Sequence, residues 1–151
     1  MKTHRIFCLG VLCIALTAFG NESPKLSEVK TFKIYFKEGF GFTLKDGELE
    51  EQTTDKKLST NGEIVFSITG EGKGLMIGTV GSTEVTIIHR PNSLIFVELP
   101  PQGSMQVLTV FKTWNKKAGG FVCVYDRCVD LGGLADIQVV STFYGVAKPF
   151  D

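Results

Sequence analysis

The residues with the clearest spacing for chemistry are the glycines of Gly70–Gly74, which read G-E-G-K-G directly after the apolar run Ile64–Thr69. A strand that runs into such a motif opens many nucleotide- and S-adenosylmethionine-binding sites, where the glycines let the backbone approach the cofactor and a helix follows. Here the following residues, Leu75–Val80, form a second strand-like run. Because the motif needs a helix N-terminus to work, we expect a glycine-rich hairpin and no cofactor.

Side chains for acid–base or nucleophilic catalysis are few. His89 is the single histidine after the first 20 residues, and no G-x-S-x-G nucleophile motif accompanies it. Glu48, Glu50 and Glu51 cluster in a polar stretch, whereas a glycosidase needs two acids held a defined distance apart on rigid elements. The other carboxylates do not fit an EF-hand loop, which leaves open only a calcium site built partly from backbone carbonyls. We therefore expect a protein that is not an enzyme and has no metal site.

Two cysteines, Cys123 and Cys128, lie outside the N-terminal leader described below and are spaced as C-V-Y-D-R-C. This spacing fits the tip of a hairpin, in which facing residues lie close enough for a disulfide. Disulfides persist in the oxidising compartments through which exported proteins pass. We therefore expect a Cys123–Cys128 disulfide, with free or metal-binding thiols as the alternative.

The N-terminus has the pattern of a secretory signal peptide. Lys2 and Arg5 precede Ile6–Phe19, an uncharged apolar run of 14 residues. A membrane-spanning helix needs about 20 such residues, whereas the apolar core of a signal peptide has about 7–15. Small residues immediately before Asn21 place the cleavage site there. We expect residues 1–20 to be removed and the mature protein to be secreted, extracellular and without a transmembrane segment.

Charge and length restrict the partners of the mature chain. Loss of Lys2 and Arg5 reduces the 16 Lys+Arg residues to 14, against 16 Asp+Glu. Nucleic-acid binding needs a clustered basic face, and the pairs Lys56-Lys57 and Lys116-Lys117 are too short to form one. Residues 21–151 suit one domain with its own core. The expected partner is an extracellular ligand, not nucleic acid, and the expected state is a monomer or weak oligomer.

The elements that position these residues are predicted to be strands, because no segment shows a sustained helical period. Runs rich in β-branched and aromatic residues recur between turns of Gly, Asn, Pro and charged residues. Glu48–Thr60 is polar and is expected to be an exposed loop. Such a pattern predicts an all-β fold, a two-sheet antiparallel sandwich of jelly-roll-like form. The expected strands are Val29–Phe36, Gly39–Lys45, Glu63–Thr69, Gly74–Val80, Thr83–Arg90, Ser93–Leu99, Met105–Trp114, Phe121–Tyr125, Cys128–Leu131 and Asp136–Tyr144.

Three segments within residues 63–150 resemble an invertebrate module, the farnesoic acid O-methyltransferase-like domain. Ile77–Glu84 (I-G-T-V-G-S-T-E) is similar to the family's I-G-G-W-G-N-T, which leads into a strand that ends in an arginine, here Arg90. Phe111–Val124 resembles its strand, Trp, Asn turn and Gly-led return strand. Ile137–Phe150 is similar to its closing strand.

The resemblance implies a β-sandwich and an animal, arthropod origin, although Thr79-Val80 replaces the family's Gly-Trp. The resemblance does not support an enzyme, and the absence of a dinucleotide-type fold from the sequence agrees with this. At a strand end beside polar residues, Trp114 is expected either to stack on a flat ligand such as a sugar or to close one end of the core. The candidate ligand-binding residues on these segments are Arg90, Trp114, Asn115 and Tyr144.

A well-specified β scaffold with no assembled catalytic set favours a secreted, non-enzymatic binding module, whose ligand is a carbohydrate, a lipid or a protein surface. The alternative is a secreted effector or toxin-like component of venom or saliva, favoured by small size, export and a disulfide. A small-molecule methyltransferase is a third hypothesis. It depends on the family name and the glycine motif, and it requires S-adenosylmethionine binding.

Overall fold

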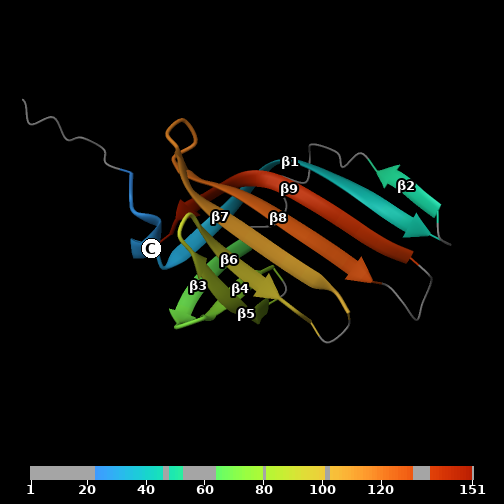
Figure 1. Ribbon diagram of the computed structural model, residues 1–151, viewed down its shortest axis with the longest axis horizontal. Helices are drawn as coiled ribbons and strands as arrows, with labels where there is room; N and C mark the ends of the chain where they lie inside the picture. Colours follow the sequence, from blue (N-terminus) through green and yellow to red (C-terminus); the bar gives the residue numbers. More distant parts are fainter. Residues whose placement is uncertain are drawn as a thin grey trace, which may run out of the picture.

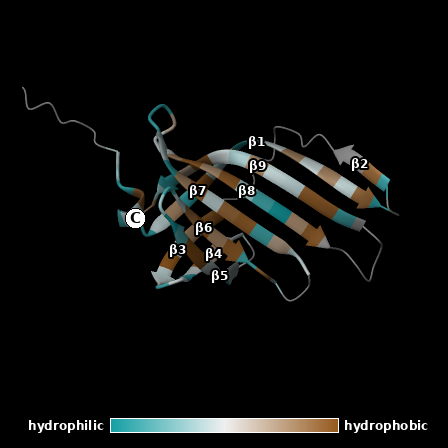
Figure 2. Ribbon diagram, viewed as in Figure 1, coloured by the Kyte–Doolittle hydropathy of each residue, from teal (hydrophilic) through white to brown (hydrophobic). Residues whose placement is uncertain are grey.

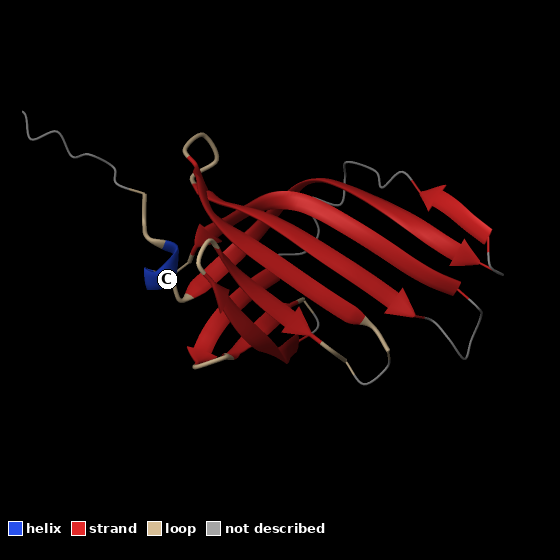
Figure 3. Cartoon of the chain, viewed as in Figure 1, coloured by secondary structure: helices blue, strands red, loops and turns tan. Residues whose placement is uncertain are grey.

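The computed structural model describes residues 23–45, 48–52, 64–79, 81–100, 103–130 and 137–150. The expected signal peptide and its cleavage site lie outside these residues. Within them, one short 3-10 turn precedes a series of strands (Figure 3). The elements are η1 (Leu26–Glu28), β1 (Thr31–Lys45), β2 (Glu48–Gln52), β3 (Ile64–Gly70), β4 (Lys73–Gly78), β5 (Gly81–Arg90), β6 (Ser93–Glu98), β7 (Met105–Asn115), β8 (Gly120–Asp130) and β9 (Ile137–Pro149).

The strands form one antiparallel sheet that closes on itself (Figure 1). The order is β2-β1-β3-β4-β5-β6-β7-β8-β9, and β9 also pairs with β1 along a ladder from Phe32↔Pro149 to Lys45↔Ile137. Eight strands therefore make a closed barrel, and β2 is an extra strand on β1. The all-β composition is confirmed, but the two-sheet sandwich, expected from strand pattern and family resemblance alike, is wrong. Alternation and turn spacing are similar in sandwiches and barrels, and the pairing of the first and last strands decides between them.

Most expected strands are found, with three differences. Val29–Phe36 and Gly39–Lys45 form the single strand β1, which has a β-bulge between Phe36 and Glu38. The two segments expected on either side of a cysteine hairpin form the single strand β8. Glu48–Gln52, expected within a loop, is strand β2 and pairs with the end of β1. The polar composition that predicted a loop here is typical of a charged edge strand.

Phenylalanine side chains fill the barrel. Phe32 and Phe96 are fully buried, and their ring centroids lie 6.0 Å apart in an edge-to-face arrangement. Phe121 and Phe66 extend this cluster, with centroid distances of 6.3 Å from Phe32 and 5.1 Å from Phe96 respectively. Each buried phenylalanine contributes about 1.5–3 kcal/mol. Among the described residues, the interior is therefore a packed aromatic core.

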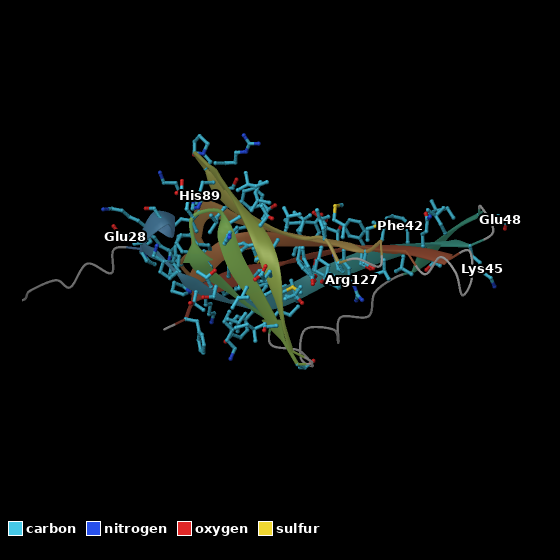
Figure 4. All side chains as sticks on the ribbon, turned by 90° about the horizontal axis from the view of Figure 1, so that it is seen from below. Glu28, Phe42, Lys45, Glu48, His89 and Arg127 are labelled. Carbon is cyan, nitrogen blue, oxygen red and sulfur yellow. The ribbon has the colours of Figure 1, made fainter. Side chains whose placement is uncertain are left out.

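The paired ends of β1, β9 and β8 continue past the barrel, on the side away from η1, as a two-faced sheet to which β2 adds (Figure 1). The bulge in β1 changes which of its residues face inward. Phe36 is opposite Gly145 before the bulge, and Gly39 is opposite Phe143 after it. Phe40 and Phe42 consequently face outward. Figure 4 shows Phe42 and Arg127 on opposite sides of this sheet, and Figure 2 shows apolar and polar residues alternating along its strands.

Candidate functional site

A cleft of about 750 Å³ opens at one end of the barrel, where η1 meets the turns between β3 and β4 and between β5 and β6. The N-terminal segment is held across the end of β3, because the Ile68 amide donates a hydrogen bond of 2.8 Å to the Lys30 carbonyl. The opposite wall is fixed by the Lys112 amide, which donates to the Asn92 carbonyl at 2.9 Å. Backbone hydrogen bonds thus bring three distant parts of the chain to one opening.

Cationic side chains dominate the lining of this cleft. Among its described lining residues Glu71 is the one acid, and the basic ones are Lys25, Lys30, His89, Arg90 and Lys112. Of these residues, Lys25 forms an ion pair, in which its Nζ lies 3.3 Å from Glu28 Oε1. Both partners of that ion pair are exposed, so the pair is weak and screened by salt. A cleft lined by one sign of charge concentrates ligands of the opposite sign.

His89 lies at the rim of the barrel. It is two residues beyond the buried Ile87 on the same strand and is opposite the buried Leu94 in register. Figure 4 shows His89 at the same end of the molecule as Glu28. The imidazole is exposed, and its position suits contact with a ligand at the mouth.

The candidate binding residues do not form one site. Arg90 lines the cleft. Trp114 packs on the core with its ring edge-to-face on Phe121, at a centroid distance of 4.9 Å. Of its two expected roles, ligand stacking and core packing, this contact corresponds to core packing. The Asn115 carbonyl and side chain accept from the amides of Gly119 and Ala118 in the β7–β8 turn.

Tyr144 lies apart from the other candidates, on the outer face of the sheet extension, where it is 46% exposed. The cleft lysines were missed by sequence reasoning, since Lys25 and Lys30 flank η1 whereas Lys112 lies on β7, far along the chain. Each is an ordinary surface lysine when the sequence is taken one segment at a time.

The glycine motif forms the expected hairpin. Glu71 and Gly72 make the turn between β3 and β4, and Gly72 has the positive φ of 66° that favours glycine. Gly74 has a packing role, because a Cβ there would lie 2.5 Å from the Ser67 carbonyl oxygen. Strand β4 follows the motif and pairs with β3. The helix N-terminus that a phosphate-binding loop requires therefore does not follow these glycines.

The expected disulfide is wrong. Cys123 and Cys128 are both free and lie on the continuous strand β8. Residues five apart on a strand are separated by about 16 Å and point to opposite faces, which no disulfide can bridge. Cys123 faces the core and is fully buried, and burial raises the pKa of its thiol to about 12. The thiol therefore stays protonated at neutral pH and is a poor nucleophile.

A polar row closes the aromatic core at the other end of the barrel. Glu98, Gln106, Arg127 and Ser141 are successive partners across β6, β7, β8 and β9. The Tyr125 hydroxyl donates to Gln106 Oε1, and burial is the main cause that raises the pKa of Tyr125 to about 12. The nearby Glu98 raises this pKa further, whereas Arg127 lowers it. Glu98 is 5% exposed, and its Oε2 has no hydrogen-bond partner in the described part of the chain.

Among the described residues, no three His, Cys, Asp or Glu side chains are grouped so that they could hold a metal ion. The same residues contain no helix long and apolar enough to cross a membrane. Comparison with protein-family models, with curated proteins and with solved structures finds no match. The resemblance to the farnesoic acid O-methyltransferase-like domain therefore stays a prediction.

Proposed function

We propose that the protein is a secreted, non-enzymatic binding module that holds an acidic carbohydrate in the basic cleft at the end of the barrel. The observation that carries this proposal is the convergence of Lys30, Arg90 and Lys112, with Lys25 and His89 beside them, on one opening. Arginine and lysine donate charge-assisted hydrogen bonds to carboxylate and sulfate oxygens. Secretion rests on the predicted signal peptide.

The filled barrel favours a carbohydrate over a lipid tail. Phe32, Phe66, Phe96 and Phe121 occupy the interior, each at most 2% exposed. Because these rings fill the interior formed by the described residues, that part of the chain favours a ligand at the mouth over an acyl chain inside the barrel. The cleft volume of about 750 Å³ lies within the range of about 300–1,000 Å³ that is common for small-ligand sites.

The test compares charge reversals inside and outside the cleft. The variant Arg90→Glu/Lys112→Glu removes two lining cations. The control Lys116→Glu/Lys117→Glu makes the same charge change at the exposed tip of the β7–β8 hairpin, outside the cleft lining. Binding is measured on an array of sulfated, uronic-acid and neutral glycans, and on vesicles of zwitterionic lipid with and without an anionic lipid.

We expect the native chain to bind sulfated or uronic-acid glycans, the cleft variant to bind at least about tenfold more weakly, and the control to stay within about twofold. Binding should also weaken as salt rises, since charge attraction is screened. Equal loss in both variants, or selective binding of neutral glycans, would refute the proposal. Binding confined to anionic vesicles would assign a lipid headgroup instead.

A further inference from the structure

The outer face of β1 and β9 carries an ordered series of side chains that is independent of the cleft. The two strands are paired along their length, so facing residues form rows across the ladder. From the barrel end to the extension, the outward-facing rows are Lys33–Lys148, Tyr35–Val146, Glu38–Tyr144, Phe40–Thr142 and Phe42–Val140. Phe150 precedes the first row, and its amide donates to the Thr31 carbonyl at 3.0 Å.

The barrel end of this face is cationic and aromatic. Lys33 Nζ lies 5.5 Å from the ring centroid of Phe150, which is 47% exposed. Lys148 Nζ lies 4.9 Å from the ring centroid of Tyr35, which is 39% exposed. These cation–π contacts place the ammonium groups over exposed rings at the surface.

The extension end is aromatic, then anionic, then apolar. Tyr144 and Phe40 lie with ring centroids 6.0 Å apart. In the next row the Thr142 hydroxyl donates to Asp126 Oδ1 at 2.7 Å, which holds that exposed carboxylate on the outer face. Beyond it, Phe42 and Val140 continue across the sheet into Cys128 and Met105 as an apolar row.

Along the strands the face thus reads apolar, cationic, aromatic, aromatic with the exposed Glu38 carboxylate beside the ring, anionic, apolar. A two-fold axis between the Val146 and Tyr144 rows places the same face of a second copy over this one in the opposite strand direction. The cationic row of each copy then faces the anionic row of the other. The axis runs across the strands and places β9 over β9, so it brings Phe150 against Val140 and Lys148 against Thr142. The Asp126 carboxylate, one strand away on β8 and bonded to the Thr142 hydroxyl, is the acid beside Lys148, and Tyr144 meets the Val146 row. We propose that this outer face is a dimer interface and that its occupant is a second, antiparallel copy of the same chain. Such an interface is isologous and closed, so it ends at two copies.

The size of the face suits a weak dimer. Ten residue steps from Val140 to Phe150 span about 33 Å, and the strands from β1 to β7 span roughly 19 Å including side chains. The footprint of roughly 600 Å² per copy lies at the low end of specific interfaces, which bury about 800 Å² per partner. Val146 is itself buried, but the exposed members of this face are Tyr35, Phe40, Val140, Tyr144 and Phe150. Exposed rings and aliphatic side chains gathered on one face are typical of interaction surfaces.

The test is sedimentation velocity over a concentration range from about 1 to 200 μM. We expect the weight-average sedimentation coefficient to rise from that of a monomer to that of a dimer. Lys148→Glu alone and Asp126→Lys alone should each raise the dissociation constant at least about tenfold. The double variant restores both contacts with reversed sign, so its dissociation constant should return to within about threefold of the native value.

Lys116→Glu, an exposed residue of the β7–β8 turn that is not in any of the rows of this face, is the matched control and should leave the dissociation constant unchanged. Far-ultraviolet circular dichroism checks that each variant is folded. Val140→Asp introduces a charge into the apolar row and should likewise raise the dissociation constant. A chain that stays monomeric over the whole range would overturn the proposal. A dimer that the single variants do not weaken, or that the double variant does not restore, would also overturn it. The result does not depend on any glycan, so failure here leaves the proposed function standing, and the reverse holds.

Discussion

Substitution of Gly145 tests whether the barrel is closed, because this residue lies where β9 is paired with a strand on each side. Its partners are Phe36 on β1 and Cys123 on β8. A Cβ at this position would lie 2.1 Å from the Tyr35 carbonyl oxygen and 2.9 Å from the Phe36 Cα. Both atoms belong to the backbone of β1, so Gly145→Ala forces the two strands apart by more than an ångström.

The expected loss of stability follows from these contacts. Overpacking costs about 1–3 kcal/mol, and the upper part of that range applies because backbone atoms must move. Replacing glycine lowers the entropy of the unfolded chain, which returns about 0.4–1 kcal/mol. The net loss is roughly 2 kcal/mol, or about 8 °C in melting temperature for a domain of this size.

The assay is urea unfolding followed by the fluorescence of Trp114, together with thermal unfolding followed by circular dichroism. Gly78→Ala is the matched control, because a Cβ there meets no heavy atom within 4 Å. It should be neutral or stabilise by up to about 1 kcal/mol. If Gly145→Ala behaved like this control, β1 and β9 would not be packed as described.

Two further predictions concern the core side of β8. Because both cysteines are free, iodoacetamide should label Cys128 quickly and Cys123 only after unfolding. Trypsin cleaves after Arg127 and puts the two cysteines on separate peptides, so mass spectrometry measures the labelling of each one alone. A disulfide-linked pair of peptides from the native protein would contradict the strand assignment. Burial raises the pKa of Cys123 from 9.0 and that of Tyr125 from 10.0, each to about 12, so both groups stabilise the fold fully below the unfolded pKa values and lose that contribution as pH rises toward 12. The free energy of unfolding measured in urea should therefore fall above about pH 9, by up to about 1.4 kcal/mol per pH unit for each group, and less steeply in Cys123→Ala. A flat profile to about pH 11 would show that neither group is buried as described.

The strands were predictable because their signal is local. Alternation in Ile64–Gly70 and in Ser93–Glu98 marks one buried face, and Glu71–Gly72 marks a turn whatever the fold. The closure of the barrel was not predictable, since it depends on Thr31–Lys45 pairing with Ile137–Pro149 about a hundred residues later. The error in β8 has a similar cause: Asp126 and Arg127 suggest a turn, yet their neighbours on β7 and β9 keep them in a strand.

The candidate site was predictable only in part, for reasons of the same kind. Arg90 was a candidate from the family resemblance, and it does line the cleft. Lys30 and Lys112 carry no local signal, because each becomes part of a basic site only when β3 and β7 end at the same opening. Trp114 was expected either to stack on a flat ligand or to close one end of the core, and its ring packs edge-to-face on Phe121.

Both ends of the described chain leave the molecule on the side of the cleft. Phe150 is hydrogen-bonded to Thr31, just after η1, and Figure 1 shows the C-terminal end beside that turn. A purification tag or fusion partner joined directly at residue 23 or 150 is thus tethered beside the basic cleft, close to its lysines. Immobilisation through the far tip, where Lys45 and Glu48 lie (Figure 4), orients the molecule with the cleft facing solution.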